Sequence, residues 1–175
     1  QKTQNDTWKL VSIGRLHHQK GYDILIKAAQ LLKYSWILEI WGEGDEHNIL
    51  QEKIRELGLV NKVFLKGYTS TPFEIMKDAD IFILSSRHEG LGNVLIEAMA
   101  SQCQLIAADC KYGPSEILEN GKYGKLVSSN DPYSMADAIN QTMEGKGFVQ
   151  YNLLKNQANN FSEKKSIDAW IHILK

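Results

Sequence analysis

Short apolar runs alternate with helical patterns along almost the whole chain, and this alternation constrains the fold more than any other feature. Five runs have the length and continuous apolar character of buried strands. We predict strands over residues 8–14, 36–42, 63–67, 80–86 and 104–109, and a smaller one over 124–128. Strands that are joined by helices and are apolar on both faces indicate an α/β fold with a doubly wound parallel sheet.

Helical patterns fill the segments between these runs. Asp131 followed by Pro132 is typical of a helix start, because aspartate can accept backbone N–H groups and proline suits the first turn. A last helix is expected to be capped by Ser162, with Ile167, Trp170, Ile171 and Leu174 on one face. We predict helices over residues 21–33, 46–58, 72–79, 94–100 and 115–119, from residue 131, and twice within residues 148–175.

The composition indicates one compact domain. The chain has 175 residues, 43% of them hydrophobic, which is enough to bury an ordinary core. A net charge of −1, with acidic and basic residues interspersed, argues against a nucleic-acid partner. No apolar run approaches the roughly 18 residues of a membrane-spanning helix. The chain begins with Gln rather than Met, so we expect a fragment in which residues 1–8 are a linker remnant and residues 9–175 are the domain.

The chain has two cysteines, Cys103 and Cys110, in an otherwise apolar stretch. Two cysteines seven residues apart do not make a disulfide framework or a zinc site. We therefore expect both to be reduced, buried thiols.

Chemistry is expected in the loops that follow the strands, since doubly wound sheets bind ligands beyond the carboxyl ends of their strands. In RHEGLGNVLIEAMA, Glu89 and Glu97 flank a turn that leads from a strand into a helix. Gly90 and Gly92 allow the backbone to approach a ligand, and the helix N-terminus favours a phosphate. Carboxylates would repel a phosphate, so Glu89 and Glu97 are better matched to the hydroxyl groups of a sugar and a ribose. This arrangement suits a nucleotide-sugar.

Each carboxylate also has a simpler explanation. Glu89 could only complement the positive end of the helix dipole. Glu97 could be a solvated residue, whereas a buried carboxylate at that position would need a partner.

Arg15 and Lys20 lie in the loop GRLHHQKG after the first predicted strand, at the same edge of the sheet. A guanidinium and an ammonium group together suit a diphosphate. The alternative is a pair of solvated surface charges, which their position at the ligand edge disfavours. His17 and His18 in the same loop are expected to be exposed and not to bind a metal, because no other donors lie nearby.

Two further patterns are weak. Gly42 and Gly44 form a GxG that lacks the third glycine of a dinucleotide fingerprint, so we interpret them as turn residues. Asp78 and Asp80 have the spacing of a metal-binding DxD, but they precede a strand and so lie at its amino end. We expect no metal cofactor.

The chain resembles the carboxyl-terminal half of a retaining glycosyltransferase of the GT-B fold, in the large family-4 group. The resemblance covers Lys9 to about Met143 and is carried by IGRLHHQKG, IWGEGDE, VFLKGY and SSRHEGLGNVLIEAMA. KYGPSEIL further resembles a segment of members that build bacterial capsule, lipopolysaccharide or glycan chains with hexoses or N-acetylhexosamines. The resemblance to the GT-B family implies a Rossmann-like domain that is one half of a two-domain architecture. The acceptor-binding amino-terminal domain would then be missing from this chain.

The resemblance implies a role for each candidate site residue. Arg15 and Lys20 would hold the diphosphate and Glu89 would contact the donor sugar, and we interpret these three as catalytic. Glu97 would bind the ribose. Gly67 and Tyr68, at a strand end, would face the base. Further contacts to the donor are implied for Gly14, Gly90, Leu91, Gly92 and Asn93.

We expect a UDP-sugar donor, metal-independent transfer, and little activity of the fragment alone. The resemblance also implies a cytoplasmic protein whose membrane contact, if present, is made by the missing half. Gln102 and Gln104 depart from the family pattern of glycine and proline and imply a changed turn before the fifth strand. A nucleotide-sugar 2-epimerase half-domain and a non-catalytic nucleotide-binding or scaffolding module remain as alternatives, and a dehydrogenase fits less well.

Overall fold

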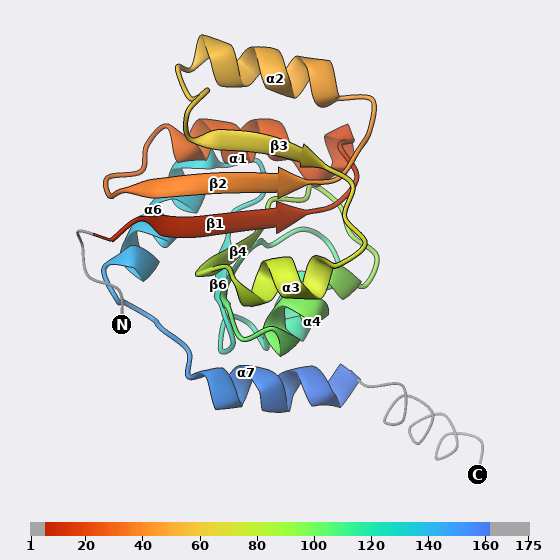
Figure 1. The fold of residues 1–175 in the computed structure, drawn as a ribbon. Coiled ribbons are helices and arrows are strands. Elements are labelled where there is room, and N and C mark those ends of the chain that lie inside the picture. Colours follow the sequence, from red (N-terminus) through yellow and green to blue (C-terminus); the bar gives the residue numbers. More distant parts are fainter. Residues whose placement is uncertain (1–5, 162–175) are drawn as a thin grey trace.

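The computed structural model describes residues 6–161, which form a parallel sheet covered by helices (Figure 1). Its six strands are arranged in the order β3-β2-β1-β4-β5-β6, with a parallel partner at every step. This is the predicted doubly wound α/β sheet. The strands are β1 (Trp8–Ile13), β2 (Trp36–Trp41), β3 (Val63–Gly67), β4 (Ile81–Leu84), β5 (Gln104–Ala108) and β6 (Lys125–Val127).

Helices form a layer on each face of the sheet. The helices are α1 (Tyr22–Ala29), α2 (His47–Glu56), α3 (Pro72–Lys77), α4 (Asn93–Ala100), α5 (Pro114–Ile117), α6 (Pro132–Met143) and α7 (Tyr151–Ala158), with 3-10 turns η1 (His18–Lys20) and η2 (Asn159–Phe161). Helices α1, α2 and α6 contribute to one apolar core, and α3, α4, α5 and α7 contribute to the other. In Figure 1, α7 lies below α4 and α3, on the side of the sheet away from α2.

Strand β4 shows why its sequence is continuously apolar. Ile81 and Ile83 belong to the first core, whereas Phe82 and Leu84 belong to the second, and all four are buried. A strand in the middle of a doubly wound sheet has no face toward water, so alternation with polar residues is absent.

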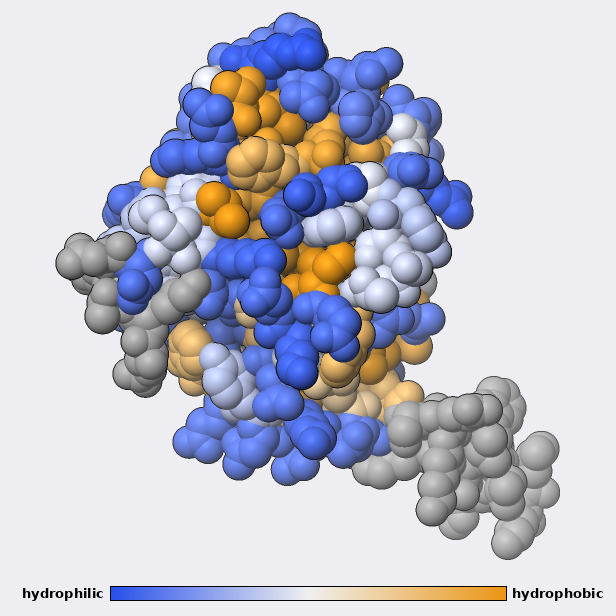
Figure 2. All heavy atoms as spheres, in the orientation of Figure 1, coloured by the Kyte–Doolittle hydropathy of each residue, from blue (hydrophilic) through white to orange (hydrophobic). Residues whose placement is uncertain are grey.

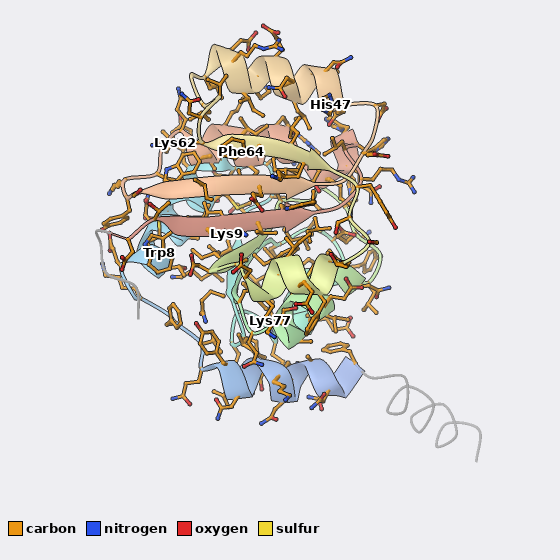
Figure 3. All side chains as sticks on the ribbon, in the orientation of Figure 1. Trp8, Lys9, His47, Lys62, Phe64 and Lys77 are labelled. Atoms are coloured by element: carbon orange, nitrogen blue, oxygen red, sulfur yellow. The ribbon has the colours of Figure 1, made fainter. Side chains whose placement is uncertain are left out.

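Strand β3, at the edge of the sheet, differs from this pattern. Its residues alternate between buried and more exposed positions, and Phe64 retains 39% exposure. Figure 2 shows apolar side chains over this part of the sheet, and Figure 3 shows Phe64 on the face that is turned to the viewer. Lys66 Nζ lies 5.5 Å from the ring centroid of Trp41, on the neighbouring strand, and so partly covers that ring.

Several boundaries differ from the sequence predictions. Trp8 was predicted both as the start of the first strand and as the last residue of the linker remnant. The strand start is confirmed and the linker boundary is wrong at this residue, since Trp8 begins β1, is buried and pairs with Trp36. The helix predicted over residues 21–33 ends at Ala29. The N–H groups of Leu31 and Leu32 bond to the carbonyl oxygens of Ala28 and Ala29, three residues back, so the α-helical pattern of bonds is not continued. The helix that we predicted to be capped by Ser162 lies outside the described residues.

Local capping was predicted correctly at α6. Asp131 accepts hydrogen bonds from the backbone N–H groups of Tyr133 and Ser134, at 2.9 and 3.2 Å, and Pro132 is the first helical residue. Cys103 and Cys110 are both buried and free, as expected. Burial raises the pKa of the Cys103 thiol to about 12.

The two glutamines that depart from the family pattern have separate roles. Gln102 adopts φ 67°, in the left-handed region that glycine adopts easily, so the turn before β5 has a conformation suited to glycine. Gln104 is buried, donates to the carbonyl oxygen of Val149 and accepts from its N–H, both at 2.9 Å. The side chain of Gln104 therefore holds the segment before α7 against the sheet.

Candidate functional site

The loops after β1 and β4 are neighbours because these two parallel strands pair directly. Lys20, in η1, and Glu89, in the loop before α4, meet there: Lys20 Nζ donates to Glu89 Oε1 at 2.7 Å. The two side chains retain 20% and 8% exposure, and Ser86 Oγ donates to the same carboxylate oxygen at 2.6 Å. The structure thus brings together two of the three residues that we predicted to be catalytic.

A buried tyrosine lies beneath this ion pair. A Cβ atom added to Gly14 would lie 2.9 Å from the Tyr22 hydroxyl and 3.3 Å from Lys20 Cε, so Gly14 leaves the space that both side chains use. Burial raises the pKa of the Tyr22 phenol, a hydrogen bond with Ser12 lowers it, and the negative charge of Glu89 raises it. The phenol therefore remains protonated and can act as a neutral support for the loop.

Gly21 fixes the end of the first loop against β4. It has φ 64°, and a Cβ atom there would lie 2.2 Å from the carbonyl oxygen of Ser85. Ser85 Oγ also donates to the carbonyl oxygen of Lys20 at 2.8 Å. Glycine is needed for the left-handed backbone and for this close approach, which explains why a glycine follows the lysine.

Arg87 adds a second connection between the same two loops. Its backbone N–H donates to the carbonyl oxygen of Gln19 at 2.7 Å, and its guanidinium donates to the carbonyl oxygen of His18 and to the carboxylate of Asp23. Burial alone would raise the pKa of the Asp23 carboxyl, but the hydrogen bond and charge of Arg87 outweigh it and lower that pKa. Sequence reasoning missed both residues.

The predicted turn glycines after β2 prove to be packing residues as well. A Cβ atom at Gly42 would lie 2.0 Å from the carbonyl oxygen of Gly14, and one at Gly44 would lie 2.2 Å from that of Leu16. Gly42 N–H also donates to the carbonyl oxygen of Gly67 at 2.7 Å. The loops after β1, β2 and β3 therefore meet at this edge of the sheet, where Tyr68 is 73% exposed.

The segment before α4 presents its backbone at the same edge. Gly92 is the N-cap residue, with φ 82°, and no side chain among the described residues caps the first N–H groups of this helix. Gly90, Leu91 and Asn93 are exposed. A Cβ atom at Gly113 would lie 2.5 Å from the carbonyl oxygen of Leu91, so the loop after β5 supports this segment closely. Gly113 also has a positive φ of 88°, which glycine adopts easily.

Arg15 and Glu97 are not brought into the Lys20–Glu89 pair. Both are exposed, and within residues 6–161 neither side chain makes a hydrogen bond or ion pair. Their charged groups are therefore accessible. The alternative of a buried Glu97 with a partner is wrong.

The residues that resembled metal ligands have structural roles. Asp80 accepts a hydrogen bond from the backbone N–H of Lys9, and Asp78 accepts one from Lys9 Nζ, both at 2.7 Å. Both aspartates lie at the amino end of β4, as predicted. His17 is exposed, and its Nδ1 accepts from the N–H of Gln19 at the start of η1. Within residues 6–161, no group of three or more His, Cys, Asp or Glu residues could hold a metal ion.

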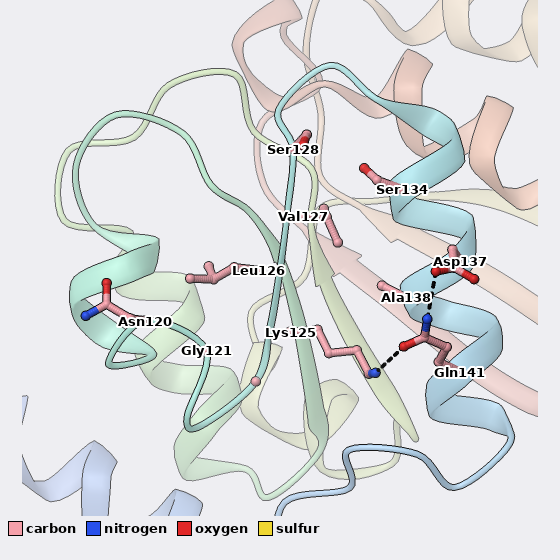
Figure 4. Close-up of a pocket in the computed structure, with 11 residues that line it drawn as sticks. Asn120, Gly121, Lys125, Leu126, Val127, Ser128, Ser134, Asp137, Ala138 and Gln141 are labelled. Carbon is pink, nitrogen blue, oxygen red and sulfur yellow. Dashed lines mark hydrogen bonds between the residues drawn. The ribbon is translucent and has the colours of Figure 1, made fainter.

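A pocket of about 410 Å³ lies elsewhere, beside the edge strand β6 and one side of α6 (Figure 4). It contains none of the predicted site residues. Lys125 donates to Gln141 Oε1 at 2.9 Å, and Gln141 donates to Asp137 at 2.7 Å. The charged side chains Lys125 and Asp137 of this pocket are therefore linked through Gln141. Its lining is Asn120, Gly121, Gly124, Lys125, Leu126, Val127, Ser128, Ser134, Asp137, Ala138 and Gln141.

Residues 1–165 match the family model described as glycosyl transferases group 1. The chain belongs to this family. A poly(ribitol-phosphate) alpha-N-acetylglucosaminyltransferase of Staphylococcus aureus is 33% identical over 174 residues, 95% of this chain. A Campylobacter jejuni transferase that adds N-acetylgalactosamine to a diphospho-undecaprenol-linked sugar is 35% identical over 135 residues, 77% of this chain. The chain spans only 35% and 37% of the length of these two relatives.

Solved structures of other proteins share the fold. A variant of S. aureus TarM in complex with fondaparinux, alpha-GlcNAc-glycerol and UDP has a TM-score of 0.79 at 30% identity, over 94% of this chain and 34% of that one. The pneumococcal O-GlcNAc transferase GtfA, in complex with UDP and GlcNAc, has a TM-score of 0.82 at 26% identity, over 95% of this chain and 35% of that one. The predicted resemblance to one Rossmann-like half of a GT-B glycosyltransferase is confirmed. Within residues 6–161, no helix has the length and apolar character needed to cross a bilayer.

Proposed function

We propose that this chain is the donor-binding domain of a retaining glycosyltransferase that transfers a hexose or N-acetylhexosamine from a UDP-sugar. The observation that carries the proposal is the Lys20–Glu89 pair, which places a cation and a carboxylate together at the carboxyl edge of the sheet. A UDP-sugar needs both, since its diphosphate is anionic and its sugar offers hydroxyl donors. Two structural neighbours were solved with UDP, which supports the choice of nucleotide.

Each part of the donor has a proposed partner. Lys20 and Arg15 bind the diphosphate, together with the uncapped N–H groups at the start of α4. Glu89 accepts hydrogen bonds from sugar hydroxyls, and the exposed Glu97 accepts from the ribose. Gly67 and the exposed Tyr68 face the base. Further backbone contacts come from Gly14, Gly90, Leu91, Gly92 and Asn93.

The proposed transfer breaks the bond between the anomeric carbon and the phosphate oxygen, and the electron pair leaves with UDP. The acceptor oxygen bonds to the anomeric carbon from the same face, so configuration is retained, and its proton is released. Lys20 and Arg15 stabilise the charge that develops on the leaving diphosphate. A positioned donor of this kind typically contributes about 3 kcal/mol in the transition state. With these cations in place the reaction needs no metal ion.

The acceptor is proposed to bind to an amino-terminal domain of the full-length protein. The relatives leave room for it, because this chain spans about a third of their length. The full-length protein is proposed to act in the cytoplasm, on a glycan, lipopolysaccharide or capsule acceptor, with any peripheral membrane contact made by its other half. The isolated chain should bind the donor and transfer little sugar.

Calorimetric titration of this chain with UDP, with and without a chelator, tests the proposal. We expect binding with the same dissociation constant in both conditions. Loss of binding on chelation would contradict the metal-free mechanism. No binding in either condition would contradict the donor-binding role and favour a non-catalytic module.

A further inference from the structure

Arg87 makes two of the hydrogen bonds that join the loops carrying Lys20 and Glu89. Arg87 lies two residues before Glu89, and its backbone N–H donates to the carbonyl oxygen of Gln19, next to Lys20. Its Nη1 donates to the carbonyl oxygen of His18 at 2.7 Å. A single residue thus fixes two successive backbone positions immediately before Lys20.

Asp23 holds the guanidinium in this position. Nη2 of Arg87 donates to Asp23 Oδ2 at 2.9 Å, and Nη1 lies 2.8 Å from Oδ1. The side chains retain 13% and 24% exposure, so the pair is largely shielded from water. Asp23 belongs to the first turn of α1, which ties the loop to a fixed element of the fold.

The contacts of Arg87 are directed at the loop rather than at either apolar core. Gln19 Nε2 adds a bond in the opposite direction, to the carbonyl oxygen of His88, at 2.9 Å. The connections of residues 18–20 to residues 85–89 therefore lie immediately before Lys20 and at Lys20 itself. Lysine at position 87 could not reproduce the side-chain contacts to His18 and Asp23, because one ammonium nitrogen cannot match a planar fork bonded to both a carboxylate and a carbonyl.

We propose that Arg87, oriented by Asp23, is a positioning residue that sets the location of Lys20 relative to Glu89, so that one donor molecule can meet both. This inference rests on the proposed function. Arg87 itself is not expected to touch the donor. Its effect on binding should therefore pass through Lys20.

A double-mutant cycle tests this dependence. R87Q should weaken UDP binding about 10-fold in the parent chain, but less than about 2-fold in a K20A background, because contacts that act through a shared partner are not additive. R87K should fail to restore affinity. R55Q is the matched control: Arg55 pairs with Glu52 at 2.7 Å on the surface, both 59% exposed, and its loss should leave UDP affinity unchanged.

Equal losses on R87Q in the parent and K20A backgrounds would overturn the inference, since Arg87 would then bind phosphate itself or support the fold in general. Full rescue by R87K would also overturn it, because charge alone would suffice.

Hydrogen exchange tests the same connection without a ligand. The Arg87 N–H, bonded to Gln19, and the Gly21 N–H, bonded to His18, should exchange faster in R87Q than in the parent or R55Q. Unchanged exchange at both amides would contradict the positioning role. If the parent chain does not bind UDP, the proposed function fails, while exchange still decides whether Arg87 holds the loop.

Discussion

Lys20 Nζ lies 2.7 Å from Glu89 Oε1, so two residues proposed to bind different parts of the donor are hydrogen-bonded to each other. An ammonium group has three donors, and it can keep this contact while it also donates to a phosphate. The carboxylate nevertheless offsets part of the positive charge that a diphosphate would meet.

Replacing Glu89 by Gln should therefore separate the two parts of the donor. We expect UDP to bind E89Q about 3-fold more tightly than the parent, since the offsetting charge is gone. UDP-sugar should bind at least about 10-fold more weakly than to the parent, because the charged acceptor for its hydroxyls is lost. Titration calorimetry measures both affinities. E119Q is the control, since it removes the same charge from the exposed Lys122–Glu119 pair. Similar losses for UDP and UDP-sugar would remove the sugar-binding role.

Gly21 and Gly58 allow the effect of close packing on stability to be separated from the effect of a left-handed backbone. Both have positive φ, 64° at Gly21 and 69° at Gly58. A Cβ atom at Gly21 would lie 2.2 Å from the carbonyl oxygen of Ser85, whereas one at Gly58 would have no atom within 4 Å. G58A should lower the free energy of unfolding by about 1 kcal/mol, and G21A by about 3 kcal/mol or more. Denaturant titration measures both values. Equal costs would contradict the packing of the first loop against β4.

Cys110 reports on the charge of Glu89. Burial raises the pKa of its thiol, and the negative charge of Glu89 raises it further. Removing that charge in E89Q lowers the thiol pKa, so more thiolate is present at a given pH and alkylation of Cys110 should accelerate. The pKa of Cys103 is raised by burial, without a contribution from Glu89, and its alkylation rate should not change. Unchanged alkylation of Cys110 would contradict this effect of the Glu89 charge on its thiol.

Much of the fold could be predicted because its signals are local. Continuous apolar runs marked the strands, and Asp131 with Pro132 marked a helix start. The position of Lys20 and Glu89 followed from a rule about strand ends that needs no contact map. Their direct pairing did not follow, since it depends on the exact path of two loops 69 residues apart.

Other features depend on tertiary contacts that leave no local pattern. Arg87 and Asp23 are 64 residues apart in sequence, and nothing near either one indicates the other. Glu97 lies in an apolar helix, and its sequence context left a solvated and a buried position both open; the structure shows it exposed. Gln102 occupies a left-handed position that a residue other than glycine rarely adopts, so its conformation could not be read from its type.

Lys20 is proposed to bind the diphosphate of a nucleotide donor, and comparing the binding of UDP and uridine to the parent chain and to K20A tests this role most directly. A charge-assisted contact of this kind contributes roughly 1.5–3 kcal/mol, so UDP should bind K20A about 10- to 100-fold more weakly. Uridine has no phosphate and should bind both chains equally. Equal losses of affinity for uridine and UDP would contradict the claim, because the loop would then support the fold or the base instead.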